Sequence, residues 1–291
     1  MTDRFATLTF ERAVAAPVET LWQAWFTPGA RALWSAPSPE VTVDYLSHAT
    51  KVGERETSLC KVEGEPVVQV DAGWLALEAN ARSVNYEAVS SEGSTMSAAL
   101  VTADFQAAGA GSQIAVTVQL SSLAQDMADG YRHGFGRGLA NLADLAARSM
   151  VLHRIIKAPV ASVWGAWLNV ETLPQWWGPD GFSCKTRRID LRAGGEWVFD
   201  MIAPDGTVFP NHHRYTRVEP HKRIAYTLLW GENGPKHADA WVEFVETADG
   251  TEVTLGMAMA TAKEWAEAKG FGAEALGQQT LGKLARFVGA N

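Results

Sequence analysis

The segment "NHHRY" at residues 211–215 holds the side chains best suited to metal binding or proton transfer. His212 and His213 are neighbours on a predicted strand, where successive side chains point to opposite faces of a sheet. They therefore cannot share one ion, and His221 and His237 lie near predicted turns without ligand spacing. We predict no metal site. One inward-facing histidine beside Arg214 is kept as a polar contact for a ligand.

A complete catalytic set is not recognisable in the sequence. There is no nucleophile elbow, phosphate-binding loop or zinc-protease helix. Glu54 and Glu196 each follow a glycine at the start of a predicted strand, where a turn-stabilising role fits better than a general base. Arg187, Arg188 and Arg192 fit a solvated strand edge that is guarded against pairing. These patterns favour binding over catalysis, and no cofactor is expected.

Apolar residues of the second half suggest a binding site of another kind. Trp176 and Trp177 end a short predicted helix, so one ring can pack inward while the other borders a cavity mouth; both could instead plug the end of the sheet. In "EVTLGMAMA", Met257 and Met259 share one strand face, which suits a cavity wall or an ordinary core. The predicted ligand-binding residues are Trp176, Trp177, Phe199, Met201, Tyr215, Tyr226, Phe244, Met257, Met259, Leu276, Thr280 and Leu284.

Composition limits the classes of partner. The chain has 291 residues, 47% hydrophobic and 20% charged, which is typical of soluble domains. No apolar run approaches the roughly 18–20 residues of a membrane span, and "MTDRFATLTFERAV" does not resemble a signal peptide. Cys60 and Cys184 form no disulfide framework, so a cytoplasmic location is expected. Residues 1–150 carry net charge −7 and residues 151–291 net −1, so neither half has the basic surplus that nucleic acid binding requires.

The sequence repeats itself at an offset of 142 residues. "APVETLWQAW" at 16–25 returns as "APVASVWGAW" at 158–167. Further matches pair Trp34 with Trp176, Gly53-Glu54 with Gly195-Glu196, Leu139 with Leu281 and Leu142 with Leu284. We predict a duplicated domain, with copies at residues 1–148 and 149–291. The join "ADLAARSMVLHRI" has no Pro or Gly, so we expect the copies to form a pseudo-dimer within the chain.

Each copy predicts the same α+β order: a strand, two short helices, about six antiparallel strands and a long C-terminal helix. In the second copy the six strands are expected at 182–191, 196–202, 208–218, 223–230, 238–246 and 251–260. The final helical segment of about 25 residues is rich in glycine, at positions 134, 136 and 138 in one copy and 270, 272, 277 and 282 in the other. Such glycines indicate close packing on the sheet or room between helix and sheet.

The second copy resembles a known family. Its motifs "APVASVWGAWLNVETLPQWWGP", "GGEWVFDMIAPDGTVF", "RYTRVEPHKRIAYTLLW" and "WVEFVETADGTEVTL" are similar to those of the activator of heat-shock-protein-90 ATPase homologue family, within the START-like (SRPBCC) superfamily. The resemblance covers nearly all of residues 151–291. It is weaker over 1–148, where "LWSAPS" replaces the Trp-Trp-Gly-Pro element. It implies a helix-grip fold with a hydrophobic cavity between a curved sheet and the long helix.

Together these patterns predict non-catalytic binding of a small apolar molecule, mainly in the second domain, with no nucleic acid and no membrane insertion. The first domain has Ser35 in place of the second tryptophan, so its site is expected to be lost or changed. Two alternatives stay open. One is a cyclase- or hydrolase-type enzyme using His212, Arg214, Tyr215 or Tyr226. The other is a co-chaperone-like adaptor that docks through its acidic first half.

Overall fold

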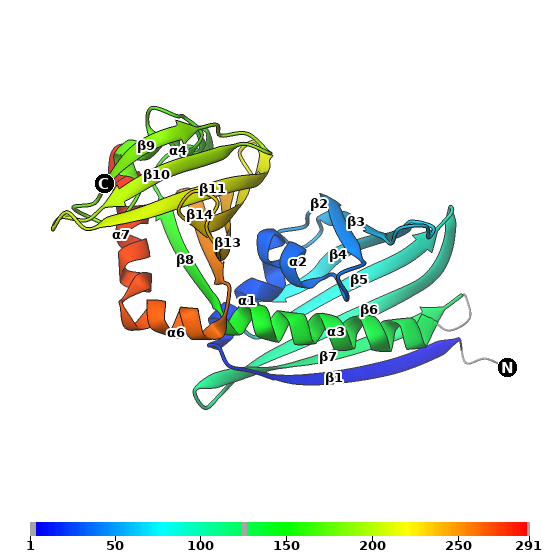
Figure 1. The fold of residues 1–291 in the computed structure, drawn as a ribbon. Helices are drawn as coiled ribbons and strands as arrows, with labels where there is room; N and C mark the ends of the chain where they lie inside the picture. The colour runs from blue at the N-terminus through cyan, green and yellow to red at the C-terminus, as the bar shows by residue number, and fades with distance from the viewer. Residues whose placement is uncertain (1–3, 124–126, 290–291) are drawn as a thin grey trace. The chain divides into compact units, whose positions relative to one another are not determined.

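The computed structural model describes residues 4–123 and 127–289 (Figure 1). The chain divides into two compact units, residues 1–147 and 148–291. Within the described residues, each unit contains a seven-stranded antiparallel sheet. None of the helices in these ranges combines the length and the apolar character that crossing a membrane requires.

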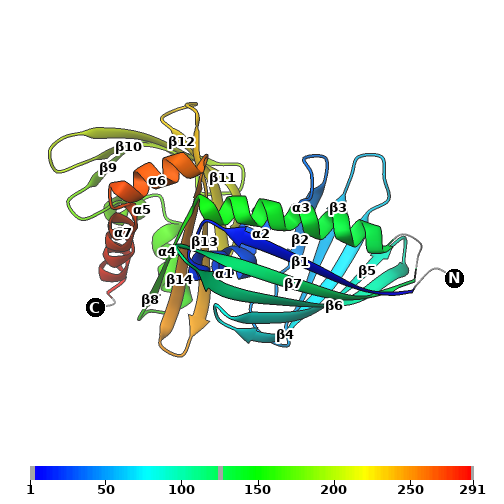
Figure 2. The same cartoon turned by 90° about the horizontal axis from the view of Figure 1, so that it is seen from below.

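In the first domain a strand and two short helices precede the rest of the sheet and one long helix. The elements are β1 (Phe5–Val14), α1 (Val18–Phe26), α2 (Pro28–Trp34), β2 (Thr42–Ser47), β3 (Arg55–Lys61), β4 (Val68–Glu78), β5 (Arg82–Ser91), β6 (Ser94–Ala108), β7 (Gly111–Ser122) and α3 (Met127–Ala147). The strand order is β1-β7-β6-β5-β4-β3-β2. Figure 2 shows α3 running along this sheet.

The second domain repeats this order. Its elements are β8 (Ser149–Ile156), α4 (Val160–Trp167), α5 (Leu173–Trp176), β9 (Ser183–Ile189), β10 (Glu196–Ile202), β11 (Val208–Glu219), β12 (Arg223–Trp230), β13 (Lys236–Thr247), β14 (Gly250–Met259), α6 (Ala262–Gly270) and α7 (Ala273–Phe287). The strand order is β8-β14-β13-β12-β11-β10-β9. The predicted α+β, START-like helix-grip fold is therefore present twice.

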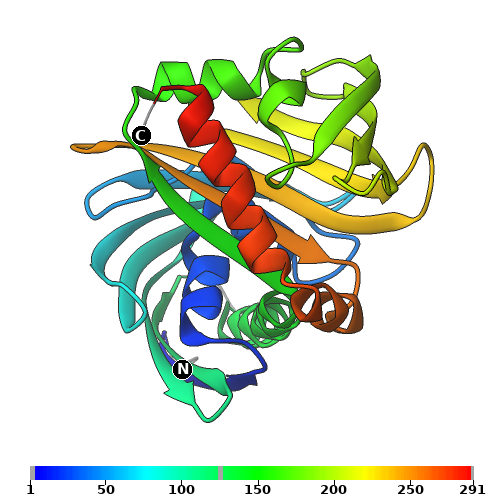
Figure 3. The same ribbon diagram turned by 90° about the vertical axis from the view of Figure 1, so that its left-hand side faces the viewer.

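One predicted element differs. The single helix of about 25 residues expected at the end of the second domain is two helices, α6 and α7. Gly272 between them has φ +82°, a left-handed conformation that glycine adopts without strain and that stops a helix. A Thr261–Glu264 capping box begins α6. In Figure 3, α7 crosses the second sheet. In the first domain α3 is one continuous helix.

The two short helices of each domain are tied together in the same way. The indole N–H of Trp34 donates to the Ala24 carbonyl at 2.7 Å, and that of Trp176 donates to the Ala166 carbonyl at 3.0 Å. Both pairs are related by the 142-residue repeat. The shared tryptophan therefore has a structural role in each domain, since its N–H group joins the two short helices and an indole N–H removed from water needs an acceptor.

In each domain a residue of the last helix donates hydrogen bonds to the loop that follows the second short helix. Asn141 of α3 donates to the carbonyl of Ala36 at 2.8 Å. At the equivalent position of α7, the Lys283 ammonium group donates to the carbonyls of Trp177, Pro179 and Phe182 at 3.2–3.4 Å. In each domain the last helix is therefore hydrogen-bonded to the loop that follows the second short helix.

Candidate functional site

The first domain contains a cavity of about 380 Å³ between the inner face of its sheet and α3. This is within the size range of small-molecule sites in proteins. Residues from α1, α2, β2–β6 and α3 line it. Six of the lining residues are aromatic: Trp25, Trp34, Tyr45, Trp74, Tyr131 and Phe135. The walls can therefore contact a flat apolar molecule over much of its surface.

Glycines of α3 make room for the cavity. Gly130, Gly134 and Gly138 recur every four residues, so they share one face of the helix, and all three line the cavity. A Cβ atom added at Gly130 or Gly134 would find no other atom within 4 Å. In the second domain, a Cβ at Gly277 of α7 would lie 2.3 Å from Leu152. Of the two roles that the sequence allowed for helix glycines, room occurs in the first domain and close packing in the second.

An ion pair occupies one wall. Both guanidinium nitrogens of Arg31 donate to the Glu56 carboxylate, at 2.7 and 2.6 Å. The two side chains are 6% and 12% exposed. The guanidinium carbon of Arg31 also lies 5.4 and 5.5 Å from the ring centres of Tyr45 and Trp74. The charge of Arg31 is therefore matched by Glu56 and held in place by aromatic faces.

A second carboxyl group, that of Glu87 on β5, faces the same cavity. Burial raises its pKa, a hydrogen bond from Tyr131 acts in the opposite direction, and the charge of Glu56 raises it further. The Tyr131 hydroxyl lies 3.3 Å from Oγ of Ser97, and burial and the charge of Glu87 raise the pKa of this phenol. Glu87 is therefore a half-buried carboxyl group in a cavity whose walls are largely apolar.

In the second domain, nine of the twelve residues predicted to bind a ligand belong to one hydrophobic core or pack against it. Eight are buried: Trp176, Phe199, Tyr215, Tyr226, Phe244, Met259, Thr280 and Leu284. Four are half-buried: Trp177, Met201, Met257 and Leu276. Trp197 stacks on Phe199 at 3.7 Å between ring centres, and His213 stacks on Tyr226 at 4.4 Å. The role of the twelve residues as ligand contacts stays a prediction.

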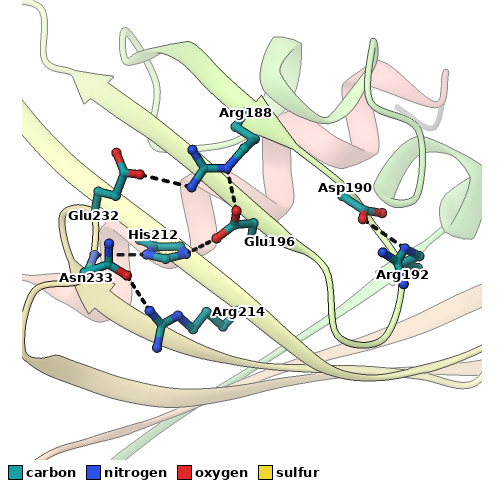
Figure 4. Close-up of polar contacts among 8 residues, drawn as sticks. All are labelled: Arg188, Asp190, Arg192, Glu196, His212, Arg214, Glu232 and Asn233. Atoms are coloured by element: carbon teal, nitrogen blue, oxygen red, sulfur yellow. Dashed lines mark hydrogen bonds and ion pairs between the residues drawn. The ribbon is translucent and has the colours of Figure 1, made fainter.

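His212 and His213 face opposite sides of the second sheet, as strand geometry requires. His213 lies in the core, where burial and His212 lower its pKa to about 3. On the other face, Nε2 of His212 is 2.8 Å from Glu196, and its Nδ1 accepts the N–H of Asn233 at 3.3 Å (Figure 4). Because Nδ1 accepts, Nε2 carries the proton and donates to the carboxylate.

Charged residues extend this network on the outer face of the sheet. Arg188 bonds to Glu196 and, at 3.1 Å, to Glu232, while Arg214 donates to the Asn233 side chain at 2.6 Å (Figure 4). Glu196 is therefore an ion-pair partner on the outer face. The arginines predicted to guard a strand edge do lie on or beside β9, an edge strand, and bond to acids.

The polar residues proposed for the enzyme alternative do not converge. Arg214 is exposed on the face that carries His212, whereas Tyr215 and Tyr226 are buried on the face that carries His213. His213 is the inward-facing histidine, whereas Arg214, the next residue of β11, points to the opposite face. A role for His213 as a polar contact for a ligand stays a prediction. No cluster of three metal-ligating side chains occurs in the part of the chain that the structure describes.

The site of the first domain was expected from the sequence to be lost or changed, so the residues that line this cavity were not predicted. Two signals were present: the four-residue spacing of Gly130, Gly134 and Gly138, and acidic residues at alternate strand positions that face inward, Glu56 and Glu87. Acidic side chains on a half-buried strand can face either solvent or an internal cavity. Only the strand register shows which of the two faces they are on.

Comparisons with known proteins concern the fold. A family model described as "Activator of Hsp90 ATPase homolog 1-like protein" matches residues 157–289. Similar solved structures include a protein from Nitrosomonas europaea, 28% identical with TM-score 0.45, covering 49% of this chain and 95% of that one. Another, from Chromobacterium violaceum, is 25% identical with TM-score 0.42 and covers 49% and 99%. A third, from Mycobacterium smegmatis, is 20% identical with TM-score 0.46 and covers 50% and 93%.

The search among curated proteins found no match. The family match lies within the second domain and includes α4, α5, the strands β9–β14 and both C-terminal helices. Residues 157–289 of the second domain are therefore similar to the Activator of Hsp90 ATPase homolog 1-like family, and the sheet order with the helix across it fits the START-like (SRPBCC) fold.

Proposed function

We propose that residues 1–148 and 149–291 act as separate START-like domains and that the first binds a small, largely apolar molecule between its sheet and α3. The observation that carries this proposal is the cavity of about 380 Å³, with aromatic walls and glycines along the helix face. Proteins of this superfamily commonly bind hydrophobic ligands, which supports the same class of function. Burial of apolar surface is the main driving force for such binding.

The sequence favoured the second domain as the main site, and that domain remains a second candidate. The observation in its favour is the buried hydroxyl group of Tyr226, which has no hydrogen-bond partner among the described residues. A buried unpaired hydroxyl is unfavourable, so a ligand atom that bonded to it would be stabilised. Half-buried Trp177 packs against this core and would border the entry.

We propose a cytoplasmic location for this activity, since both cysteines are free thiols. Cys60 and Cys184 lie in different domains, and neither forms a disulfide. Free, partly buried thiols persist in a reducing compartment.

The test uses the neutral fluorescent probe N-phenyl-1-naphthylamine with the full chain. Gly134→Leu places a side chain in the open space of the cavity, and we expect it to weaken probe binding at least about tenfold by occupying the ligand's volume. Gly136→Leu is the matched control, because Gly136 lies on the same helix and does not line the cavity. We expect this control to bind like the unaltered protein.

Three results would count against the first domain. Equal binding by Gly134→Leu and Gly136→Leu would show that the probe sits elsewhere. Binding that survives Gly134→Leu and is lost in Trp177→Ala would place the ligand in the second domain. Absence of saturable fluorescence enhancement in the unaltered protein would remove the proposal for this class of ligand.

A further inference from the structure

We propose that the ligand of the first domain carries a positively charged amino group and that the Glu87 carboxylate binds it. The ligand class is then a small apolar amine, with the aromatic walls holding its body and Glu87 holding its charged end. This inference rests on the proposed function, since it concerns the same cavity.

The position of Glu87 leaves its carboxyl group open to the cavity. On β5 it pairs with Ala72 of β4 on one side and with Ala99 of β6 on the other. Both neighbours are small, and Val89 lies two positions along the same strand face. Neither of these strand neighbours therefore blocks the approach of a ligand atom to the carboxyl group from the cavity side.

The charges that line the cavity do not balance. Arg31 is the one cation among the lining residues, all of which the structure describes, and its two terminal guanidinium nitrogens both donate to Glu56. None of the described residues forms an ion pair with Glu87. When Glu87 is ionised, the cavity carries one uncompensated negative charge. An isolated buried charge is costly, whereas a hydrogen-bonded pair of opposite charges is tolerated.

Two further features suit a cation. Aromatic rings attract a cation that lies over their faces, and six line this cavity. Tyr131 from α3 donates a hydrogen bond to the Glu87 carboxyl, and Ser97 from β6 lies 3.3 Å from the Tyr131 hydroxyl. This chain of contacts orients the carboxylate, so less freedom is lost when the amino group binds.

The affinity for an amine should depend on pH, because Glu87 must lose its proton to bind the charged amino group. Burial raises the pKa of Glu87, so part of the cost of binding an amine at low pH is removal of a proton from this carboxyl. The other groups facing Glu87 do not reverse this direction. Glu56 and Arg31 are paired, and burial raises the pKa of Cys60, Tyr45 and Tyr131, which keeps them neutral at pH 7. The affinity for an amine should therefore rise between pH 5 and pH 8.

The experiment compares three probes of nearly equal shape: 1-naphthylmethylamine, 1-naphthylmethanol and 1-naphthoate. Titration calorimetry with the full chain at pH 7.5 should give about tenfold tighter binding for the amine than for the alcohol, and the weakest binding for the acid. In Glu87→Gln the preference for the amine should disappear, while affinity for the alcohol should be unchanged. Glu65→Gln, at an exposed site in the same domain, should keep the preference and controls for net charge.

Each outcome decides. Equal binding of alcohol and amine by the unaltered protein overturns the inference and leaves the proposed function standing, as does an amine preference that survives Glu87→Gln. Failure of all three probes to bind removes the proposed function as well. If Glu87→Gln loses the alcohol too, the pH profile of the unaltered protein decides, and amine affinity that does not rise from pH 5 to pH 8 overturns the inference.

Discussion

Strand register identifies which rows of residues, running from strand to strand, are equivalent in the two sheets. In the first domain Trp74 of β4 pairs with Asn85 of β5, and in the second Tyr215 of β11 pairs with Tyr226 of β12. The Trp74 carbonyl accepts a hydrogen bond from the N–H of Gly53, which lies just before β3, at 3.1 Å. The Tyr215 carbonyl likewise accepts one from the N–H of Gly194, just before β10, at 2.8 Å. These two rows therefore occupy equivalent places in the fold.

The next inward-facing row differs in volume and charge. In the first domain it reads Glu56, Ala72, Glu87 and Ala99; in the second it reads Trp197, His213, Leu228 and Ala238. Small and acidic side chains in the first domain stand where the second has large rings and a leucine. The same backbone arrangement therefore leaves a cavity in one domain and packs aromatic rings together in the other.

The second short helix of each domain, α2 or α5, also carries a charged residue in the first domain and an apolar one in the second. Arg31 of α2 and Leu173 of α5 are related by the repeat. Arg31 pairs with Glu56, whereas Leu173 and Trp197 are buried in one hydrophobic cluster. The residue at position 31 or 173 and its partner at 56 or 197 thus differ together between the domains. The cavity and its ion pair are therefore linked features of the first domain.

The largest expected effect comes from separating the ion pair. Arg31→Leu gives the first domain the residue of the second and leaves the Glu56 carboxylate buried without its cation. We expect a loss of about 3–5 kcal/mol in the free energy of unfolding. Urea unfolding of the full chain, with hydrogen–deuterium exchange to assign the transition to the first domain, measures it.

The matched double variant Arg31→Leu/Glu56→Leu should recover most of this loss, because it removes both charges together. Equal destabilisation by the single and double variants would show that packing around Arg31, and not the unpaired carboxylate, determines the effect.

The fold could be predicted well from the sequence, and particular residues show why. The strands expected at 196–202 and 223–230 are β10 and β12 with the same limits, because turn-forming residues bound them on both sides. The break at Gly272 was missed, since a glycine within a helical pattern can continue the helix or end it.

The site was harder to predict. Whether a helix glycine makes room or closes a gap depends on the side chains opposite it. Gly134 faces open space and Gly277 faces Leu152, although both lie on glycine-containing helices of similar pattern. The acids Glu56 and Glu87 look solvent-exposed in the sequence until strand register places them on the inner face.

A smaller effect is expected from acid in the second domain. The pKa of His213 is lowered to about 3 in the folded chain, below the value of about 6.5 in an unfolded one. Between these values the unfolded chain binds the extra proton, so stability falls as pH drops, by about 1.4 kcal/mol for each pH unit. We expect about 2 kcal/mol between pH 6.5 and pH 5.

His213→Phe keeps an aromatic ring against Tyr226 and cannot titrate, so the slope of stability against pH should be reduced in this variant. Burial also lowers the pKa of His153 and His237, and their contribution should remain. An unchanged slope in His213→Phe, measured by urea unfolding at pH 5, 6 and 7, would refute the assignment to His213.

The smallest effects should differ in sign between the two domains. Gly134→Ala adds a methyl group to open space on a helix, and we expect it to stabilise the chain by about 0.5–1 kcal/mol, the helix propensity difference between the two residues. Gly277→Ala gains the same propensity but forces a Cβ atom to 2.3 Å from Leu152, which is buried, so overpacking of about 1–3 kcal/mol should exceed the gain. Thermal unfolding of the two variants measures both. Stabilisation by both substitutions would mean that α7 has as much room over its sheet as α3, and the contrast between an open first domain and a closely packed second would fail at the helix.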